Sequence, residues 1–170
     1  MGPKSTSIRD LKKHLERAVT EVVLLHGDGK DAPFEKRPGR YLLNVDGGMK
    51  DGIGAFGWVL SDPGDNVVAL RSGKVELSST PRSWIQQAEY AALNDGLDYA
   101  TSIGIRQIRV YLDNQVVVDQ VDGRATVKDA VLLKLHDATK HLIQDLDCRV
   151  YWVPRERNAA ADSLVRRELS

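Results

Sequence analysis

The segment from Tyr41 to Gly48 constrains the fold of this chain most strongly, because an apolar run ends there on a carboxylate and two glycines. Tyr, Leu and Val favour a buried strand, and paired glycines end the strand and let backbone or a ligand approach closely. An acid at the end of a buried strand is costly unless a positive group lies beside it. Asp46 is therefore either a turn-forming residue or a metal ligand.

The composition indicates one globular domain with an appendage. The chain has 170 residues, of which 42% are hydrophobic and 28% charged, and this length supports a single core. We expect an N-terminal helix and linker over residues 1–40 and a compact domain over residues 41–170. No apolar run reaches the roughly 18 residues of a membrane span, and no secretion signal is evident. We therefore expect no membrane partner and a location in the cytoplasm, or in the nucleus of a eukaryote.

Charge and cysteine content exclude some kinds of site. Cys148 is the only cysteine, which excludes an internal disulfide and a cysteine-based zinc site. Residues 1–40 carry nine Lys+Arg against six Asp+Glu, which leaves 15 against 18 for the rest of the chain. An acidic body argues against nucleic-acid binding, unless several of its acids hold divalent cations.

The N-terminal region predicts one amphipathic helix. Apolar residues recur at three- and four-residue steps over residues 8–25, and Gly and Pro then indicate a linker up to residue 40. This helix either packs on the body, or binds a protein partner or a second copy of the chain, or forms a weak basic arm for nucleic acid.

The rest of the chain predicts an α/β fold with a mixed five-stranded sheet. The first three strands form an antiparallel meander, and the crossover helix after them makes the fourth strand a parallel neighbour of the first. Helices then cover the faces of the sheet. We expect strands at residues 41–48, 54–61, 66–77, 107–112 and 147–153, and helices at residues 83–103, 114–121, 127–146 and 158–169.

Two acids follow strands, and a third lies on the apolar side of a helix. Asp46 and Asp113 end the first and fourth strands, and parallel strands place both at the sheet edge where open α/β sheets bind ligands. Glu89 shares its helical stripe with Ile85 and Ala92. We therefore expect Glu89 to face the core instead of solvent.

Asp162 repeats this pattern on the last helix, where Val165 and Leu169 share its face. Carboxylates that gather in one place repel each other and raise each other's pKa unless cations bridge them. Oxygen ligands without a nearby His or Cys indicate magnesium or manganese. Two such ions about 4 Å apart can activate water and stabilise the leaving oxygen in phosphodiester hydrolysis.

Four segments, in this order, resemble ribonuclease H type 1. They are residues 46–48, 87–93, 110–114 and 153–162, and the resemblance runs from about Tyr41 to Leu169. It implies a ribonuclease-H-like catalytic domain that cleaves the RNA strand of an RNA/DNA hybrid, with two Mg²⁺ ions or with Mn²⁺ in their place. It also implies 5′-phosphate and 3′-hydroxyl ends. The family's catalytic and metal-binding set maps onto Asp46, Glu89, Asp113 and Asp162.

The loop before Asp162 resembles the archaeal-type subgroup. Many bacterial members place a His there, whereas this chain has Arg155, which the resemblance implies is catalytic; a structural or phosphate-binding role is the alternative. Residues 119–145 hold no basic insertion, so the basic protrusion of many bacterial enzymes is missing. Arg166 and Arg167 are further candidates for phosphate contacts, or a solvated helix end.

The expected substrate contacts depart from the family pattern at one point. Family members carry Thr-Asn-Asn where this chain has Trp84-Ile85-Gln86, and a Gln amide can also hydrogen-bond a sugar hydroxyl. The substrate-binding candidates are Gly47, Gly48, Gln86, Gln87, Asn114, Arg157 and Asn158. We expect Asn158 to hold the start of the last helix as well.

Two rival functions remain from the sequence. One is a non-catalytic ribonuclease-H-like domain that assembles with, or binds nucleic acid for, a larger reverse-transcriptase-like complex. The other is a related 3′-exonuclease, which normally carries Asp-x-Glu in its first motif, whereas Gly47 and Gly48 follow Asp46 here.

Overall fold

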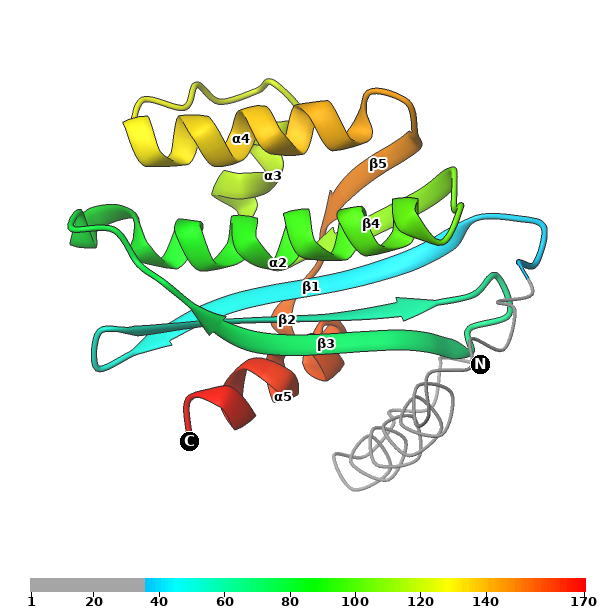
Figure 1. Ribbon diagram of the computed structural model, residues 1–170, viewed down its shortest axis with the longest axis horizontal. Helices are drawn as coiled ribbons and strands as arrows, with labels where there is room; N and C mark the ends of the chain where they lie inside the picture. The colour runs from blue at the N-terminus through cyan, green and yellow to red at the C-terminus, as the bar shows by residue number, and fades with distance from the viewer. Residues whose placement is uncertain (1–35) are drawn as a thin grey trace.

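The computed structural model describes residues 36–170 (Figure 1). The helix expected at residues 8–25 lies outside the described residues. The strands are β1 (Tyr41–Lys50), β2 (Ile53–Ser61), β3 (Val67–Val75), β4 (Gln107–Leu112) and β5 (Asp147–Trp152). The α-helices are α2 (Trp84–Ser102), α3 (Gln115–Val121), α4 (Ala130–Ile143) and α5 (Ala159–Glu168), with short 3₁₀ turns at Pro81–Ser83 and Arg155–Arg157.

The five strands form one mixed sheet in the order β3-β2-β1-β4-β5. β1 pairs antiparallel with β2, and β2 with β3, whereas β1–β4 and β4–β5 are parallel. This arrangement confirms the predicted fold class and the predicted parallel pairing of the first and fourth strands. It places the carboxyl ends of β1 and β4 at the same edge.

Helices cover the two faces of the sheet unequally (Figure 1). α2 packs against β1 and β2, and α4 lies outside α2 on the same side. On the opposite side, α5 packs against β1, β2 and β3. Across residues 36–170, no helix is both apolar enough and long enough to cross a bilayer.

The core lies between the sheet and α2. Fully buried side chains such as Leu43 and Leu60 from the sheet meet Leu93 and Leu97 from α2. Each such side chain contributes about 1.5–3 kcal/mol to the free energy of folding. This packing fixes α2 on the sheet and therefore fixes the position of every polar side chain that α2 carries.

Two consecutive glycines let helices approach β1 from both faces. A Cβ on Gly47 would lie 2.2 Å from the carbonyl carbon of Ala88 in α2, so α2 passes directly over β1 at this residue. A Cβ on Gly48 would lie 3.0 Å from Cγ1 of Val165 in α5. Gly47 and Gly48, expected as substrate-binding residues, thus lie against α2 and α5.

The helix expected at residues 127–146 is shorter than its apolar pattern indicates. Asp129 has an extended backbone, and its Oδ1 accepts hydrogen bonds of 2.9 Å from the backbone N–H groups of Val131 and Leu132. This N-cap starts α4 at Ala130. The third strand similarly ends at Val75 instead of residue 77.

Candidate active site

Three acids from three different elements meet at one edge of the sheet. Asp46 lies in β1, Glu89 in the second turn of α2, and Asp113 directly after β4. One oxygen from each carboxylate lies within 4.8 Å of the other two. The parallel pairing of β1 and β4 brings the two aspartates together, and the close approach at Gly47 brings Glu89 to them.

Glu89 faces the interior as expected, but Ile85 does not share its buried stripe. The side chain of Glu89 is buried, with a relative exposure of 3%. Ile85, expected on the same buried stripe, is 50% exposed. The buried stripe of α2 instead passes through Ala88, Ala92 and Gly96, and Ile85 lies in the first turn outside it.

Burial and mutual repulsion raise the pKa values of all three carboxyl groups. Burial raises the pKa of Asp46 to about 7, and the charges of Asp113 and Asp162 add to this effect. Burial also raises the pKa of Glu89 well above its usual value, with Asp46 and Asp113 contributing. The pKa of Asp113 is raised mainly by burial, against the lowering effect of Arg155. The three carboxyl groups therefore lie close together with only Arg155, within the described part of the chain, as a positive group to offset their charge.

The donor set fits a hard divalent cation. Oε2 of Glu89 is buried and has no hydrogen-bond partner among the described residues. A buried carboxylate oxygen without a partner costs about 1–3 kcal/mol or more. A cation bound by Asp46, Glu89 and Asp113 would satisfy this oxygen and neutralise the clustered charge, and oxygen-only ligands suit Mg²⁺ or Mn²⁺.

Asp162, the fourth expected ligand, does not belong to this group of three. Its Oδ2 lies 2.8 Å from Nε of Arg166, and its Oδ1 lies 3.3 Å from Nη2 of Arg155. Its charge nevertheless raises the pKa of Asp46 and of Asp113, so it lies in the same electrostatic site. Two arginines therefore hold Asp162 beside the cluster.

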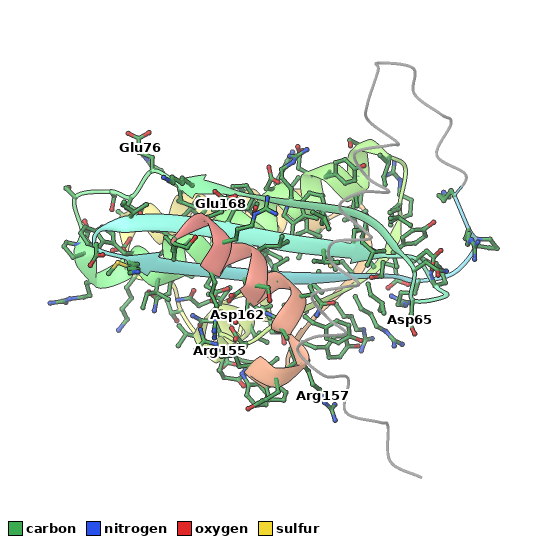
Figure 2. The ribbon with its side chains drawn as sticks, turned by 90° about the horizontal axis from the view of Figure 1, so that it is seen from below. Asp65, Glu76, Arg155, Arg157, Asp162 and Glu168 are labelled. Carbon is green, nitrogen blue, oxygen red and sulfur yellow. The ribbon has the colours of Figure 1, made fainter. Side chains whose placement is uncertain are left out.

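Arg155 is the positive group closest to the cluster in the described residues. Its side chain is 68% exposed, and its Nε lies 4.0 Å from Oδ2 of Asp113. Figure 2 shows Arg155 directly beside Asp162 on α5, whereas Arg157 extends away from the sheet. Arg155 thus bridges two predicted metal ligands and remains accessible to an anion.

Asn158 and Gln87, two of the expected substrate contacts, make their hydrogen bonds inside the protein. Asn158 is buried; its Nδ2 donates to the carbonyl of Val45 at 2.7 Å and its Oδ1 accepts from Asn44 at 3.1 Å. The sequence predicts that Asn158 holds the start of α5, but its side chain makes no capping hydrogen bond there. The Gln87 amide binds the backbone N–H and hydroxyl of Ser78.

The other expected substrate contacts remain at least partly accessible. Gln86 is half-buried beside Gln87, and Arg157 is exposed. Asn114 is half-buried, and its Oδ1 accepts from the backbone N–H of Val117, which caps α3. This bond uses the amide oxygen of Asn114, the residue that directly follows Asp113.

Trp152 is a site residue that the sequence reasoning missed. It ends β5, its side chain is 48% exposed, and its Nε1 donates to the carbonyl of Asp113 at 3.1 Å. It therefore fixes the backbone that carries one of the three carboxylates. An apolar aromatic at the end of a strand is ordinary in sequence, so only the register of β4 with β5 reveals this contact.

The sequence matches the family described as reverse transcriptase-like over residues 44–168. A bifunctional protein of Mycobacterium tuberculosis is 34% identical over 131 residues, which are 74% of this chain and 34% of that protein. Ribonuclease HI of Halobacterium salinarum is 31% identical over 136 residues, which are 78% of this chain and 66% of that protein. The chain thus spans about a third of the length of its mycobacterial relatives.

Solved structures show the same fold. Ribonuclease H1 of Halobacterium salinarum has a TM-score of 0.70 at 28% identity, over 77% of this chain and 98% of that one. The N-terminal ribonuclease H domain of the Mycobacterium tuberculosis protein also scores 0.70, at 30% identity, over 76% and 93%. The fold and its carboxylate cluster define a ribonuclease-H-like protein. By sequence and structure together, the chain belongs to the ribonuclease HI family.

Proposed function

We propose that this chain is a metal-dependent endoribonuclease that hydrolyses the RNA strand of RNA/DNA hybrids and leaves 5′-phosphate and 3′-hydroxyl ends. The observation that carries this proposal is the buried cluster of Asp46, Glu89 and Asp113 with its unpartnered Glu89 oxygen. A domain kept only for assembly has little physical reason to hold three buried like charges together. Residues 41–170 would form the catalytic domain.

The cluster would hold the catalytic ions. Asp46, Glu89 and Asp113 would bind Mg²⁺, and Asp162, which lies beside them, would help to hold a second ion; Mn²⁺ suits the same oxygens. Bound there, the ions would activate the attacking water and stabilise the leaving oxygen. The unpartnered oxygen of Glu89 is available to an ion or to that water.

Arg155 would act as a fixed positive charge. Its ion pair with Asp162 raises its pKa above the usual arginine value, so it keeps its proton at neutral pH. It therefore cannot serve as the proton donor that a loop histidine could be. Because its side chain is exposed, it can bind the phosphate next to the scissile bond while it pairs with Asp162.

Gln86, Asn114 and Arg157 would contact the substrate directly. Gln86 can hydrogen-bond a 2′-hydroxyl, which distinguishes RNA from DNA. Gly47, Gly48, Gln87 and Asn158 would act through the backbone that they pack or hold. A protein partner or a dimer through residues 8–25 and a cytoplasmic location stay predictions, because they rest on residues outside the described part of the chain or on composition.

The test is cleavage of a labelled RNA/DNA hybrid beside double-stranded and single-stranded RNA, with Mg²⁺, Mn²⁺ or EDTA. We expect metal-dependent cuts only in the RNA strand of the hybrid, with products that a 5′-phosphate-specific exonuclease degrades. Cleavage of the DNA strand of the hybrid at a similar rate would contradict the assignment of Gln86, because DNA has no 2′-hydroxyl. A folded sample that cuts nothing with either metal would favour a binding domain of a larger complex.

A further inference from the structure

One part of the sheet carries polar side chains that the site above does not use. The pairing of β1 with β4 and of β4 with β5 aligns Leu42 with Arg109 and Arg109 with Arg149, and in the next row Tyr111 with Tyr151. Paired residues point to the same face of a sheet. Gly48 of β1 faces α5, and Leu42 shares its face, so all these side chains lie on the α5 side.

This region, which we call the open face, comprises Arg109, Tyr111, Arg149 and Tyr151. α5 packs against β1, β2 and β3 on this side, and in Figure 1 it lies below those strands. Arg109, Arg149 and Tyr151 are accordingly exposed. Two of these residues, Arg149 and Tyr151, also line the groove between α3 and β5.

Two arginines lie directly opposite each other on the open face. Like charges at paired positions of neighbouring strands destabilise a sheet unless something neutralises them. Within residues 36–170, neither Arg109 nor Arg149 makes a hydrogen bond or an ion pair. Asp147, on the same face of β5, pairs with Arg40 at 2.6 Å, and Arg149 contributes to lowering the pKa of Asp147 only through its charge. Two neighbouring guanidinium groups that make no hydrogen bond to the described residues match a polyanion.

The aromatic pair beside the arginines narrows the class of polyanion. The rings of Tyr111 and Tyr151 stack with centroids 5.7 Å apart and planes at 30°. Tyr151 is 37% exposed, so its ring can take a further stacking partner. Exposed aromatic rings next to arginines form the usual platform for unpaired bases, whereas an acidic peptide would require the arginines alone.

We propose that the open face binds single-stranded nucleic acid, with Arg109 and Arg149 on its phosphates and Tyr151 stacked on a base. Tyr111 lies two residues before Asp113, and its partner Asn44 lies two residues before Asp46, on the same face. A single strand that extends from the carboxylate cluster can therefore reach the open face. This binding requires no metal ion and no cleavage, so it can be tested separately from the proposed activity.

The test is fluorescence anisotropy of labelled 20-nucleotide single-stranded RNA and DNA with the full chain in EDTA. We expect the Arg109→Gln/Arg149→Gln variant to bind about tenfold or more weakly, with the slope of log K against log salt reduced by about 1–2. Tyr151→Ala should weaken binding about tenfold and Tyr151→Phe should retain it, because phenylalanine keeps the ring. Circular dichroism melts check that each variant is folded.

The matched control is Lys128→Gln/Lys134→Gln, which removes two exposed charges near and on α4. It should bind like the wild type, and the arginine variant should still cleave a short blunt hybrid if the proposed activity is correct. Equal binding by the arginine variant and the wild type would overturn the proposal. So would full competition by polyglutamate together with unchanged binding by Tyr151→Ala, because that result assigns the open face to an acidic protein.

Discussion

Nε of Arg166 lies 2.8 Å from Oδ2 of Asp162, one helical turn earlier on α5. With Arg155 at 3.3 Å from the other oxygen, it neutralises the one predicted metal ligand that lies outside the group of three. A cation that approaches Asp162 must therefore compete with two arginines. This relationship makes the arginines, as well as the acids, determinants of metal affinity.

We expect Arg166→Gln to bind Mg²⁺ more tightly, by about fivefold, because removal of a nearby positive charge is worth about 1 kcal/mol at this range. The free energy of unfolding should change by less than about 1 kcal/mol, since the arginine side chain is 70% exposed. Isothermal titration with Mg²⁺ measures the affinity. Weaker binding would mean that Arg166 orients Asp162 as a ligand instead of competing for it.

Arg155→Gln should show a different pattern, with tighter metal binding but slower cleavage. Loss of one charge-assisted hydrogen bond to phosphate costs about 1.5–3 kcal/mol, or roughly tenfold to a hundredfold in rate. Arg155→Lys should recover part of the rate, since it keeps the charge and loses the planar geometry. Steady-state rates at saturating Mg²⁺ test this. An undiminished cleavage rate in Arg155→Gln would contradict the proposed phosphate contact and indicate that Arg155 has a structural role only.

Asp46→Asn and Asp113→Asn should each reduce hybrid cleavage by at least about a hundredfold, because each removes a charged oxygen from the cluster. Both variants should remain folded, since asparagine keeps the size of the side chain. Asp145→Asn, an exposed acid without a described contact, is the matched control and should cleave like the wild type. Cleavage by Asp46→Asn at the wild-type rate would refute the assigned site.

The stability of the metal-free protein should depend on pH through Asp46. Burial raises its folded-state pKa from 3.8 to about 7, so the folded state keeps a proton that the unfolded state has lost. The free energy of unfolding therefore falls as pH rises from about 4 to about 7, by up to about 4 kcal/mol. Glu89 and Asp113 act in the same direction.

Urea denaturation in EDTA at several pH values measures this dependence. Asp46→Asn should flatten the curve and be more stable than the wild type above pH 7, and Mg²⁺ should remove much of the difference by stabilising the wild type. Parallel curves for the two proteins would contradict the raised pKa.

Asn158→Ala should destabilise the protein by about 1–3 kcal/mol, because it leaves the buried carbonyl of Val45 without a donor. Asn158→Asp should be no better, since a carboxylate cannot donate to that carbonyl. Urea denaturation gives the loss of stability, and KM for the hybrid separates the two roles of this residue. A large rise in KM with unchanged stability would return Asn158 to the substrate-binding residues.

Gly47→Ala should be more damaging than Gly48→Ala. Its Cβ would meet the backbone of Ala88 at 2.2 Å, whereas the Cβ of Gly48 would meet one side-chain methyl of Val165 at 3.0 Å. Overpacking against backbone costs about 1–3 kcal/mol or more. Gly47→Ala should have the lower melting temperature and the slower cleavage of the two variants, since displacement of α2 also moves Glu89. Equal melting temperatures for the two variants would contradict the close approach.

The sequence by itself determined the sheet and most of the site. Local apolar patterns and turn residues specify each strand, and a crossover helix dictates the parallel pairing that joins Asp46 to Asp113. The buried position of Glu89 also followed from its helical stripe, although Ile85 on that stripe proved exposed. The strands and the helical stripe depend on neighbours a few residues apart, and the parallel pairing follows from the general rule for crossover connections, so both are visible in sequence.

Only the tertiary structure decided which polar atoms have partners. The side chain of Asn158 donates to the carbonyl of Val45, and the amide of Gln87 binds Ser78. The indole of Trp152 donates to the carbonyl of Asp113. The register of β4 with β5 aligns Arg109 with Arg149. Each of these contacts joins residues from separate elements, and their geometry depends on strand register and on how closely a helix packs. A hydrogen bond needs its two atoms about 3 Å apart, and local sequence patterns do not specify long-range geometry that finely.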